Sequence, residues 1–295
     1  MVNIDNTQIF ATSLCPVCNN LSIVIDSVRT INPECDETVN LRNCSSCKHW
    51  WIDPIPTQNY LSRLYSESSL FVINKGFGED SKESKTETNR VIKYSKKILK
   101  LSTKQNNFNF LEVGVGSGHI FNYFTSRAKL CYGVEPGSWK PLHTNIVVDI
   151  KDIPENIKFD IIVMHDVLEH LSNPLEMLTR LHNMANAECL ISLGFPNSDS
   201  LSALLFRGKW RMVRPLGHIH FFSSKSTLKL LDKCGWNIIL MQKCRPLHLS
   251  TFDLLKQFNF KNFRNPLRGI YRLLWMFVMD IVLGKDQWFI QAKKK

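Results

Sequence analysis

The chain has 295 residues, a net charge of +11, 44% hydrophobic residues and 21% charged residues. These values are ordinary for a globular protein with one large domain and a small one. The opening MVNIDNTQIF lacks the basic and apolar regions of a signal peptide, and no apolar run is long enough to cross a bilayer, which argues against secreted and membrane-spanning classes. We therefore expect a cytoplasmic protein whose thiols stay reduced.

Two Cys-x-x-Cys pairs stand near the start of the chain, Cys15-Pro-Val-Cys18 and Cys44-Ser-Ser-Cys47, with 25 residues between them. Such pairs are a common way to surround a zinc ion with four thiolates, and a four-sulfur site is closed and therefore structural. Disulfides or unlinked core thiols are the alternatives, and a reducing compartment disfavours disulfides. The segments SIVID and TVNLR between the pairs alternate like two short strands. Residues 10–56 are therefore predicted to form a small zinc ribbon.

Residues 57–106 are predicted to be a linker followed by a leading helix. The polar stretch GEDSKESKTETNR passes into a segment whose apolar residues recur at helical spacing. We expect Val91, Ile92, Ile98 and Leu99 to form the buried face of that helix.

From residue 107 onward, segments typical of strands and helices alternate. The expected strands are NFNFLEVGVG, LCYGVEP, TNIVVDI, FDIIVMHDV, ECLISLGFPN, WNIILMQK and DQWFIQAKK. The expected helices are HIFNYFTSRA, PLEMLTRLHNMA and SSKSTLKLLDKCG, the last with a serine cap and with Gly235 just past its end. Apolar strands alternating with helices predict a parallel sheet covered on both faces. We expect residues 107–295 to form a Rossmann-like, doubly wound α/β domain with a seven-stranded, mostly parallel sheet.

Three glycines, Gly114, Gly116 and Gly118, follow the first strand of this domain at alternate positions. Glycine permits positive φ and close approach of a ligand to the backbone. Glu135 ends the second strand and Asp149 follows the third, and ligands bind at the carboxyl ends of parallel strands. Either acid alone is equally well explained as a surface or turn residue. In this order, the loop and the two acids indicate a nucleoside site, with Glu135 accepting from ribose hydroxyls and Asp149 from an adenine amino group.

The glycine loop is part of a longer pattern, EVGVGSG, which begins at Glu112. This pattern resembles a motif of the class I S-adenosylmethionine-dependent methyltransferases. Two further segments resemble motifs of the same family: FDIIVMHDVLEHLSNP at the fourth strand and GHIHFFSSKSTLKLLDKCGW before the sixth. CPVC followed by CSSCKHWWIDPIPT looks like the zinc-binding N-terminus of a subset of them, which works in nucleotide-sugar and surface-polysaccharide biosynthesis. The resemblance implies bound S-adenosylmethionine, a structural Zn²⁺ ion, and a small acceptor such as a sugar or nucleotide-linked saccharide. The candidate cofactor residues are Glu112, Gly114, Gly116, Gly118, Glu135, Asp149 and, at the edge of the site, Asp166.

Methyl transfer requires an oriented nucleophile and a group that accepts its proton. His170 in LEHL and His218 in PLGHIHFF are the candidate bases, because histidine titrates near neutral pH. Packing or a hydrogen bond at a helix start is the alternative role of His170, and one of His218 and His220 is expected to face the sheet interior. The similar sugar C-methyltransferases carry His-Glu-His here, whereas this chain has Gly217 in place of the glutamate. O-methylation of a hydroxyl therefore remains open, and C-methylation is disfavoured.

Much of the positive charge lies near the C-terminus, because residues 241–295 contain 11 Lys and Arg against 3 Asp and Glu. NPLRGIYRLLWMFVMDIVLG, within a predicted helical insertion at 250–284, opens with Asn-Pro as a helix start. Arg264, Arg268 and Arg272 share one face of this helix. Segment 264–284 has three interpretations: packing on the domain, a homodimer contact, or a peripheral contact with a membrane surface.

The sequence is compatible with two other functions. A methyltransferase acting on a lipid-linked or quinone-like acceptor at the membrane surface would use the basic, apolar C-terminal helix. A nucleic-acid-binding module would use the zinc ribbon and the positive charge, but residues 11–56 contain only Arg29, Arg42 and Lys48 as basic residues against five acids. A ribbon that grips nucleic acid should be basic, so we expect no nucleic-acid partner.

Overall fold

The computed structural model describes most of the chain, and the predicted C-terminal insertion is the largest part outside it. The described residues are 9–10, 14–29, 38–57, 59, 61, 82–116, 118–136, 145–214, 217–244 and 285–295. The predicted insertion at 250–284, its helix and its membrane or dimer contact all lie outside these residues. Among the helices of the described ranges, none combines the length and the apolar character that crossing a membrane requires.

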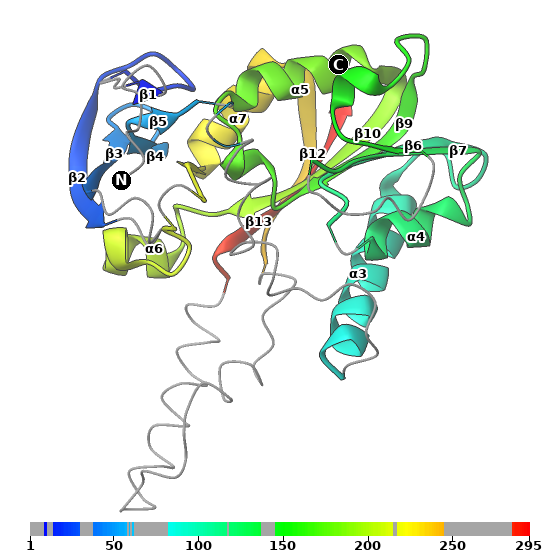
Figure 1. Cartoon of the computed structure of the whole chain (residues 1–295), viewed down its shortest axis with the longest axis horizontal. Helices are drawn as coiled ribbons and strands as arrows, with labels where there is room; N and C mark the ends of the chain where they lie inside the picture. Colours follow the sequence, from blue (N-terminus) through cyan, green and yellow to red (C-terminus); the bar gives the residue numbers. More distant parts are fainter. Residues whose placement is uncertain are drawn as a thin grey trace, which may run out of the picture.

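Seven strands form the central sheet, in the order β12-β13-β10-β9-β6-β7-β8 (Figure 1). Neighbouring strands from β10 to β8 run parallel, while β13 runs antiparallel to both β10 and β12. This confirms the predicted Rossmann-like α/β fold with a mostly parallel sheet. The strands are β6 (Asn109–Val113), β7 (Leu130–Val134), β8 (Ile146–Val147), β9 (Phe159–His165), β10 (Ala185–Pro196), β12 (Trp236–Cys244) and β13 (Gln287–Lys294).

Helices cover both faces of the central sheet, because successive side chains of a buried strand point to opposite sides. Leu111 and Ile162 belong to the apolar cluster under α5 and α7, whereas their neighbours Phe110 and Ile161 belong to the cluster under α3 and α4. Figure 1 shows the first pair of helices above the sheet and the second pair below it. The helices are α3 (Lys82–Leu101), α4 (His119–Thr125), α5 (Pro174–Asn183) and α7 (Ser224–Lys233).

Helix α7 begins and ends at the predicted signals. The Ser223 side chain accepts a hydrogen bond from the amide of Ser226, and Gly235 follows the helix with a φ of +79°. Strand β10 begins earlier than expected, at Ala185, the last residue of the segment predicted to be a helix. Its pairing with β9 is irregular between Ala185 and Leu190, so the backbone stays extended while the ladder is interrupted there.

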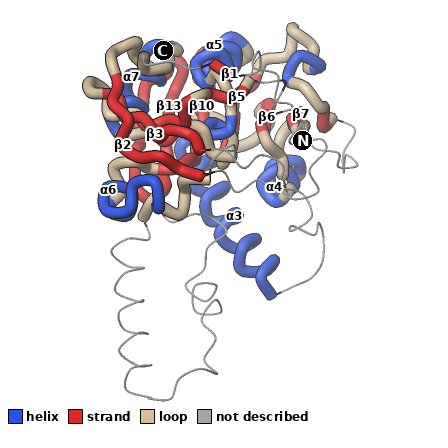
Figure 2. Tube along the Cα trace, turned by 60° about the vertical axis from the view of Figure 1, so that its left-hand side comes forward, coloured by secondary structure: helices blue, strands red, loops and turns tan. Residues whose placement is uncertain are grey.

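A smaller antiparallel sheet is built largely from the cysteine-rich segment, in the order β11-β4-β3-β2. Figure 2 shows two of its strands, β2 and β3, side by side. Its edge strand β11 comes from the GHIHFF segment, where His220 pairs with Trp51 and Phe221 with Trp50. This pairing was not predicted, and it joins the small sheet to the main domain. The strands are β2 (Ser22–Arg29), β3 (Thr38–Cys44), β4 (Trp50–Asp53) and β11 (His220–Phe221), and the separate strand β1 (Ile9–Phe10) pairs with β5 (Ile55–Pro56).

A short segment after the fifth parallel strand packs on the outside of this small sheet. It consists of α6 (Leu201–Phe206) and the turn η4 (Arg207–Lys209), which lie beside β2 in both views (Figures 1 and 2). The amide of Gly208 donates a hydrogen bond of 2.9 Å to the Asp26 side chain of β2. The cysteine-rich segment is therefore attached to the main domain on two sides.

Candidate functional site

The glycine loop joins β6 to α4 at the carboxyl edge of the sheet. Gly114, Gly116 and Gly118 have φ angles of +78°, +48° and +73°, a conformation that disfavours any residue with a Cβ atom. A Cβ atom on Gly114 would lie 2.2 Å from Val167 Cγ2, so this glycine also allows the segment after β9 to approach the loop. A Cβ atom on Gly116 would meet no atom of the described residues within 4 Å. The loop is thus closed against the protein at Gly114 and open at Gly116.

Two carboxylates flank this loop. The Glu135 side chain accepts a hydrogen bond of 2.8 Å from the amide of Gly116. Glu112 lies inside β6 with only 4% of its surface exposed. Burial, and then the nearby charge of Glu135, raise the pKa of Glu112 well above its usual value. A cationic ligand at the loop would favour the charged form of Glu112.

The two predicted aspartates have different surroundings. Asp149 is exposed, caps the turn η2 (Ile150–Asp152), and accepts a hydrogen bond of 2.9 Å from the amide of Lys151. Asp166 has a φ of +54° and accepts a hydrogen bond of 2.5 Å from the side-chain amide of Gln287 in β13. A small hollow beside Asp166 is lined by Tyr94, His165, Asp166, Gly194, Cys244, Gln287, Trp288 and Phe289. The candidate site at the carboxyl edge therefore extends from the glycine loop to β13. The sequence analysis did not predict that β13 contributes residues to it.

His170 and His218 lie side by side just beyond the end of β9, with ring centroids 4.7 Å apart and rings nearly perpendicular. His170 lies in the turn η3 (Leu168–His170), and its Nδ1 lies 2.7 Å from the carbonyl oxygen of Gly217. Nδ1 of His218 lies 2.7 Å from the carbonyl oxygen of Met212. A carbonyl oxygen can only accept, so each histidine donates from Nδ1. The structure thus brings the two candidate bases together.

Glu169 shares this turn and is completely buried. Burial, and then the charge of Asp166, raise the pKa of its carboxyl group well above the usual value. Its Oε1 lies 3.9 Å from Nε2 of His170. The structure therefore groups Glu169 with the two histidines.

The expectation for His218 and His220 needs correction, because both side chains are buried. His220 lies in β11 with its Nδ1 3.1 Å from Nε2 of His49. Burial lowers the pKa of His220 to about 4, so its imidazole is neutral near pH 7. His218 precedes the two-residue strand β11 and turns toward His170, so strand alternation does not separate the two histidines.

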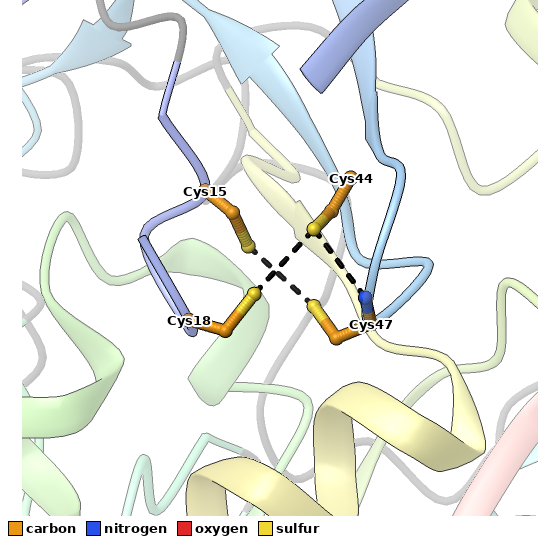
Figure 3. A group of neighbouring side chains, drawn as sticks. All are labelled: Cys15, Cys18, Cys44 and Cys47. Carbon is orange, nitrogen blue, oxygen red and sulfur yellow. Dashed lines mark hydrogen bonds between the residues drawn. The ribbon is translucent and has the colours of Figure 1, made fainter. Parts of the chain in front are cut away.

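The four paired cysteines converge at one point of the small sheet (Figure 3). The sulfur atoms of Cys15 and Cys47 lie 3.5 Å apart, as do those of Cys18 and Cys44. Zn–S bonds of about 2.3 Å in a tetrahedron require S–S distances of about 3.8 Å, which this arrangement nearly meets. The donor set therefore suits zinc.

Comparison with known families decides the class of the protein. A family model described as a methyltransferase domain matches residues 87–240, which is more than half of the chain. The chain belongs to this methyltransferase family. Together with the glycine loop and the seven-stranded sheet, the match identifies residues 87–240 as a methyltransferase domain.

The chain is also similar to solved proteins in fold and to curated proteins over part of its sequence. The fold is similar to magnesium protoporphyrin IX methyltransferase of Synechocystis PCC 6803 with bound SAH, at a TM-score of 0.50 and 12% identity over 81% of this chain and 100% of that one. The methyltransferase is 25% identical over 168 residues to the tRNA U34 carboxymethyltransferase of Aliivibrio fischeri strain MJ11, covering 50% of this chain and 51% of that protein. The same-named protein of Aliivibrio salmonicida is 25% identical over 158 residues. The chain thus spans about half the length of the curated relatives that it matches.

Proposed function

We propose that this methyltransferase transfers the methyl group of S-adenosylmethionine to a hydroxyl of a small acceptor, a sugar or nucleotide-linked saccharide. The sequence resemblance to methyltransferases of polysaccharide biosynthesis supports the acceptor class. One observation carries the choice of a hydroxyl: His170 and His218 meet just beyond the end of β9, while Gly217 stands where similar C-methyltransferases have a glutamate. Because Val167 touches Gly114, this histidine pair is only a few residues from the loop that would hold the sulfonium.

The cofactor residues follow from the same edge of the sheet. Glu135 would accept from the ribose hydroxyls, and the open backbone at Gly116 would let the ligand approach. Asp149 keeps one carboxylate oxygen in its cap, so an adenine amino group would use the other. The remaining members of the proposed cofactor site are Glu112, Gly114, Gly118 and Asp166.

The chemistry asks little of the protein beyond orientation. The sulfonium is already electrophilic, so the site must align the acceptor oxygen, the methyl carbon and sulfur, and help the hydroxyl lose its proton. In the simplest form, His218 or His170 accepts that proton. Since each ring donates from Nδ1 to a carbonyl, the lone pair of the neutral ring is on Nε2.

Product mass tests the acceptor class. The purified enzyme is incubated with labelled S-adenosylmethionine and a panel of nucleotide sugars, and a gain of one methyl group with loss of a hydroxyl proton is expected for at least one of them. Unmodified tRNA and a quinone-type lipid form two further arms. Methylation of only one of those arms would overturn the saccharide proposal, and methylation at carbon would overturn the hydroxyl proposal.

A lipid-linked or quinone-like acceptor is the second candidate, and the predicted basic helix at 264–284 motivates it. Flotation with anionic liposomes separates the two. An enzyme that stays at the bottom of the gradient at low salt lacks the membrane contact that this candidate needs, whereas co-flotation that salt abolishes supports it.

We further propose that residues 10–56 form a ribbon around one structural zinc ion, followed by the linker and leading helix at 57–106 and the methyltransferase domain at 107–295. The convergence of the four sulfur atoms supports the metal. One zinc per chain is expected in the purified enzyme by elemental analysis. Cys44→Ser should remove it, while Cys131→Ser, which changes a buried cysteine outside the group, should keep it. Zinc retained by the first variant would contradict the assignment.

A further inference from the structure

Glu169, His170 and His218 form a second cluster of metal-ligating side chains. One ligand atom from each residue lies within 4.8 Å of the others. The cluster is separate from the four cysteines, because it lies at the end of β9 in the main domain and contains no thiol. Two imidazoles and one carboxylate are a ligand set that suits divalent first-row metals and leaves coordination positions open.

The Glu169 carboxyl group needs a partner that the described residues do not supply. Its side chain is 0% exposed, and neither of its oxygen atoms has a hydrogen-bond partner within the described part of the chain. Burying a carboxylate without hydrogen bonds or a counter-charge is costly, and such groups are normally paired or bound to a metal. The carboxyl group points toward His170, whose Nε2 lies 3.9 Å from Oε1.

The two histidines are held as metal-binding histidines usually are. Each places Nδ1 2.7 Å from a backbone carbonyl oxygen, Gly217 for His170 and Met212 for His218. Metal-ligating histidines commonly donate one ring N–H to a carbonyl, which fixes the tautomer and directs the lone pair of the other nitrogen at the metal. A histidine that serves only to fill space needs no such orientation.

Backbone hydrogen bonds hold the two ligand-bearing segments in register. The amide of Ile219 donates to the carbonyl oxygen of Glu169 at 2.8 Å, which ties the segment after His218 to the turn η3. The amide of His170 donates to the carbonyl oxygen of Val167 at 2.9 Å, and that of His218 to Arg214 at 2.8 Å. Glu169 and His170 come from one segment and His218 from another that is distant in sequence. These hydrogen bonds fix the two segments to each other before any ligand binds.

We propose that Glu169, His170 and His218 bind one divalent first-row metal ion that coordinates the acceptor hydroxyl. The His170 side chain is 23% exposed, so the site has an accessible side for water or acceptor. A bound divalent ion makes a coordinated hydroxyl more acidic. The O–H proton then passes to solvent, the oxygen attacks the methyl carbon, the new C–O bond forms, and the C–S bond breaks to leave a neutral thioether. The histidines act here as ligands rather than as bases.

Titration of the enzyme with Mn²⁺ tests the site without any acceptor, and the electron paramagnetic resonance signal of Mn²⁺ measures the binding. Mn²⁺ is chosen because it prefers oxygen and nitrogen ligands and is the weakest competitor for the four cysteines. We expect one Mn²⁺ per chain in the purified enzyme, and loss of at least ~10-fold in Mn²⁺ affinity in both Glu169→Gln and His218→Ala. His182→Ala is the matched control, because His182 packs against Trp236 at the end of α5 and should leave Mn²⁺ binding unchanged.

The role of the metal rests on the proposed function, but its binding does not, so the two can fail separately. Calorimetry with S-adenosylmethionine on enzyme prepared without added Mn²⁺ tests the methyltransferase site alone. Enzyme that binds S-adenosylmethionine but no Mn²⁺ would overturn only the metal site, as would equal Mn²⁺ affinity in wild type and Glu169→Gln. If His218→Ala does not fold, Glu169→Gln still decides, because it keeps the shape of the side chain and its thermal unfolding is checked alongside.

Discussion

The Glu135 carboxylate accepts a hydrogen bond of 2.8 Å from the amide of Gly116, across the gap between the ends of β7 and β6. The two strands are direct parallel neighbours, so the acid and the glycine loop reach the same edge of the sheet. The hydrogen bond orients the carboxylate over the open part of the loop before any ligand arrives. An acid held in this way is ready to accept from a ribose without further ordering.

Replacement of Glu135 tests this arrangement. Glu135→Ala should weaken S-adenosylmethionine binding by about 10- to 100-fold, since a hydrogen bond to a charged group contributes about 1.5–3 kcal/mol. Isothermal titration calorimetry gives the affinity, and circular dichroism checks the fold. Glu188→Ala is the control, because the Glu188 side chain is 71% exposed and its ion pair with Lys293 is long, at 3.8 Å. Equal affinity in wild type and Glu135→Ala would refute the ribose assignment.

Features with a strong local pattern could be predicted from the sequence. The strands of the main sheet are short apolar runs, and the loop shows its need for positive φ as glycine at three alternate positions. The two Cys-x-x-Cys pairs also carry their own spacing, and their sulfur atoms converge. In each case the physical requirement falls on residues close together in sequence.

Features that depend on distant pairing could not be predicted. Strand β11 has only two residues, too few to show an alternating pattern. It pairs with β4, which is far away in the sequence: His220 of β11 comes 171 residues after His49, the residue before β4. Asp166 meets Gln287 from the last strand, and Glu169 is buried between segments that meet only in the folded chain. No spacing in the sequence reports these encounters, so the grouping of Glu169 with the histidines appeared only in three dimensions.

The first two glycines of the loop, Gly114 and Gly116, should respond differently to replacement by alanine. Gly114→Ala places a Cβ atom 2.2 Å from Val167 Cγ2, so it should lower the free energy of unfolding by several kcal/mol, as overpacking and left-handed strain together do. The new Cβ atom of Gly116→Ala meets no atom within 4 Å in the described part of the chain, so the change should cost only about 1 kcal/mol of backbone strain.

Ligand binding reverses this order, because the space beside Gly116 is where the ligand would approach. Gly116→Ala should therefore reduce S-adenosylmethionine affinity more than its small loss of stability explains. Urea unfolding and calorimetry on both variants give the comparison. An affinity of Gly116→Ala equal to wild type would remove the open loop from the proposed site.

A buried ion pair connects the segment after α6 to the start of β13. Arg211 donates to Asp286 through Nε at 2.7 Å and Nη2 at 2.8 Å, and Trp210 Nε1 lies 3.3 Å from the same carboxylate. Asp286 is fully buried and Arg211 is one-third exposed. Asp286→Ala should lower the free energy of unfolding by about 2–3 kcal/mol, below the range for a fully buried pair because solvent partly screens Arg211.

The exposed pair between Asp232 and Lys295 is the matched control for that experiment. Asp232→Ala should change the free energy of unfolding by less than 1 kcal/mol, because exposed ion pairs contribute little. Urea unfolding of both variants at one ionic strength supplies the comparison. Similar effects of the two changes would mean that the Asp286 contacts do not hold the segment in place.

His165, at the end of β9, should make stability depend on pH. Burial, opposed in part by the charge of Asp166, lowers its pKa to about 4, against about 6.5 in the unfolded chain. Because the pKa is lower in the folded protein than in the unfolded chain, the neutral His165 side chain contributes fully to the free energy of unfolding above pH 6.5. This stabilisation is lost as the pH falls toward 4. Between pH 7 and 5 the loss is about 2 kcal/mol. Urea unfolding at these pH values should show a shallower dependence in His165→Asn than in wild type, whereas parallel curves would show that His165 does not titrate on unfolding.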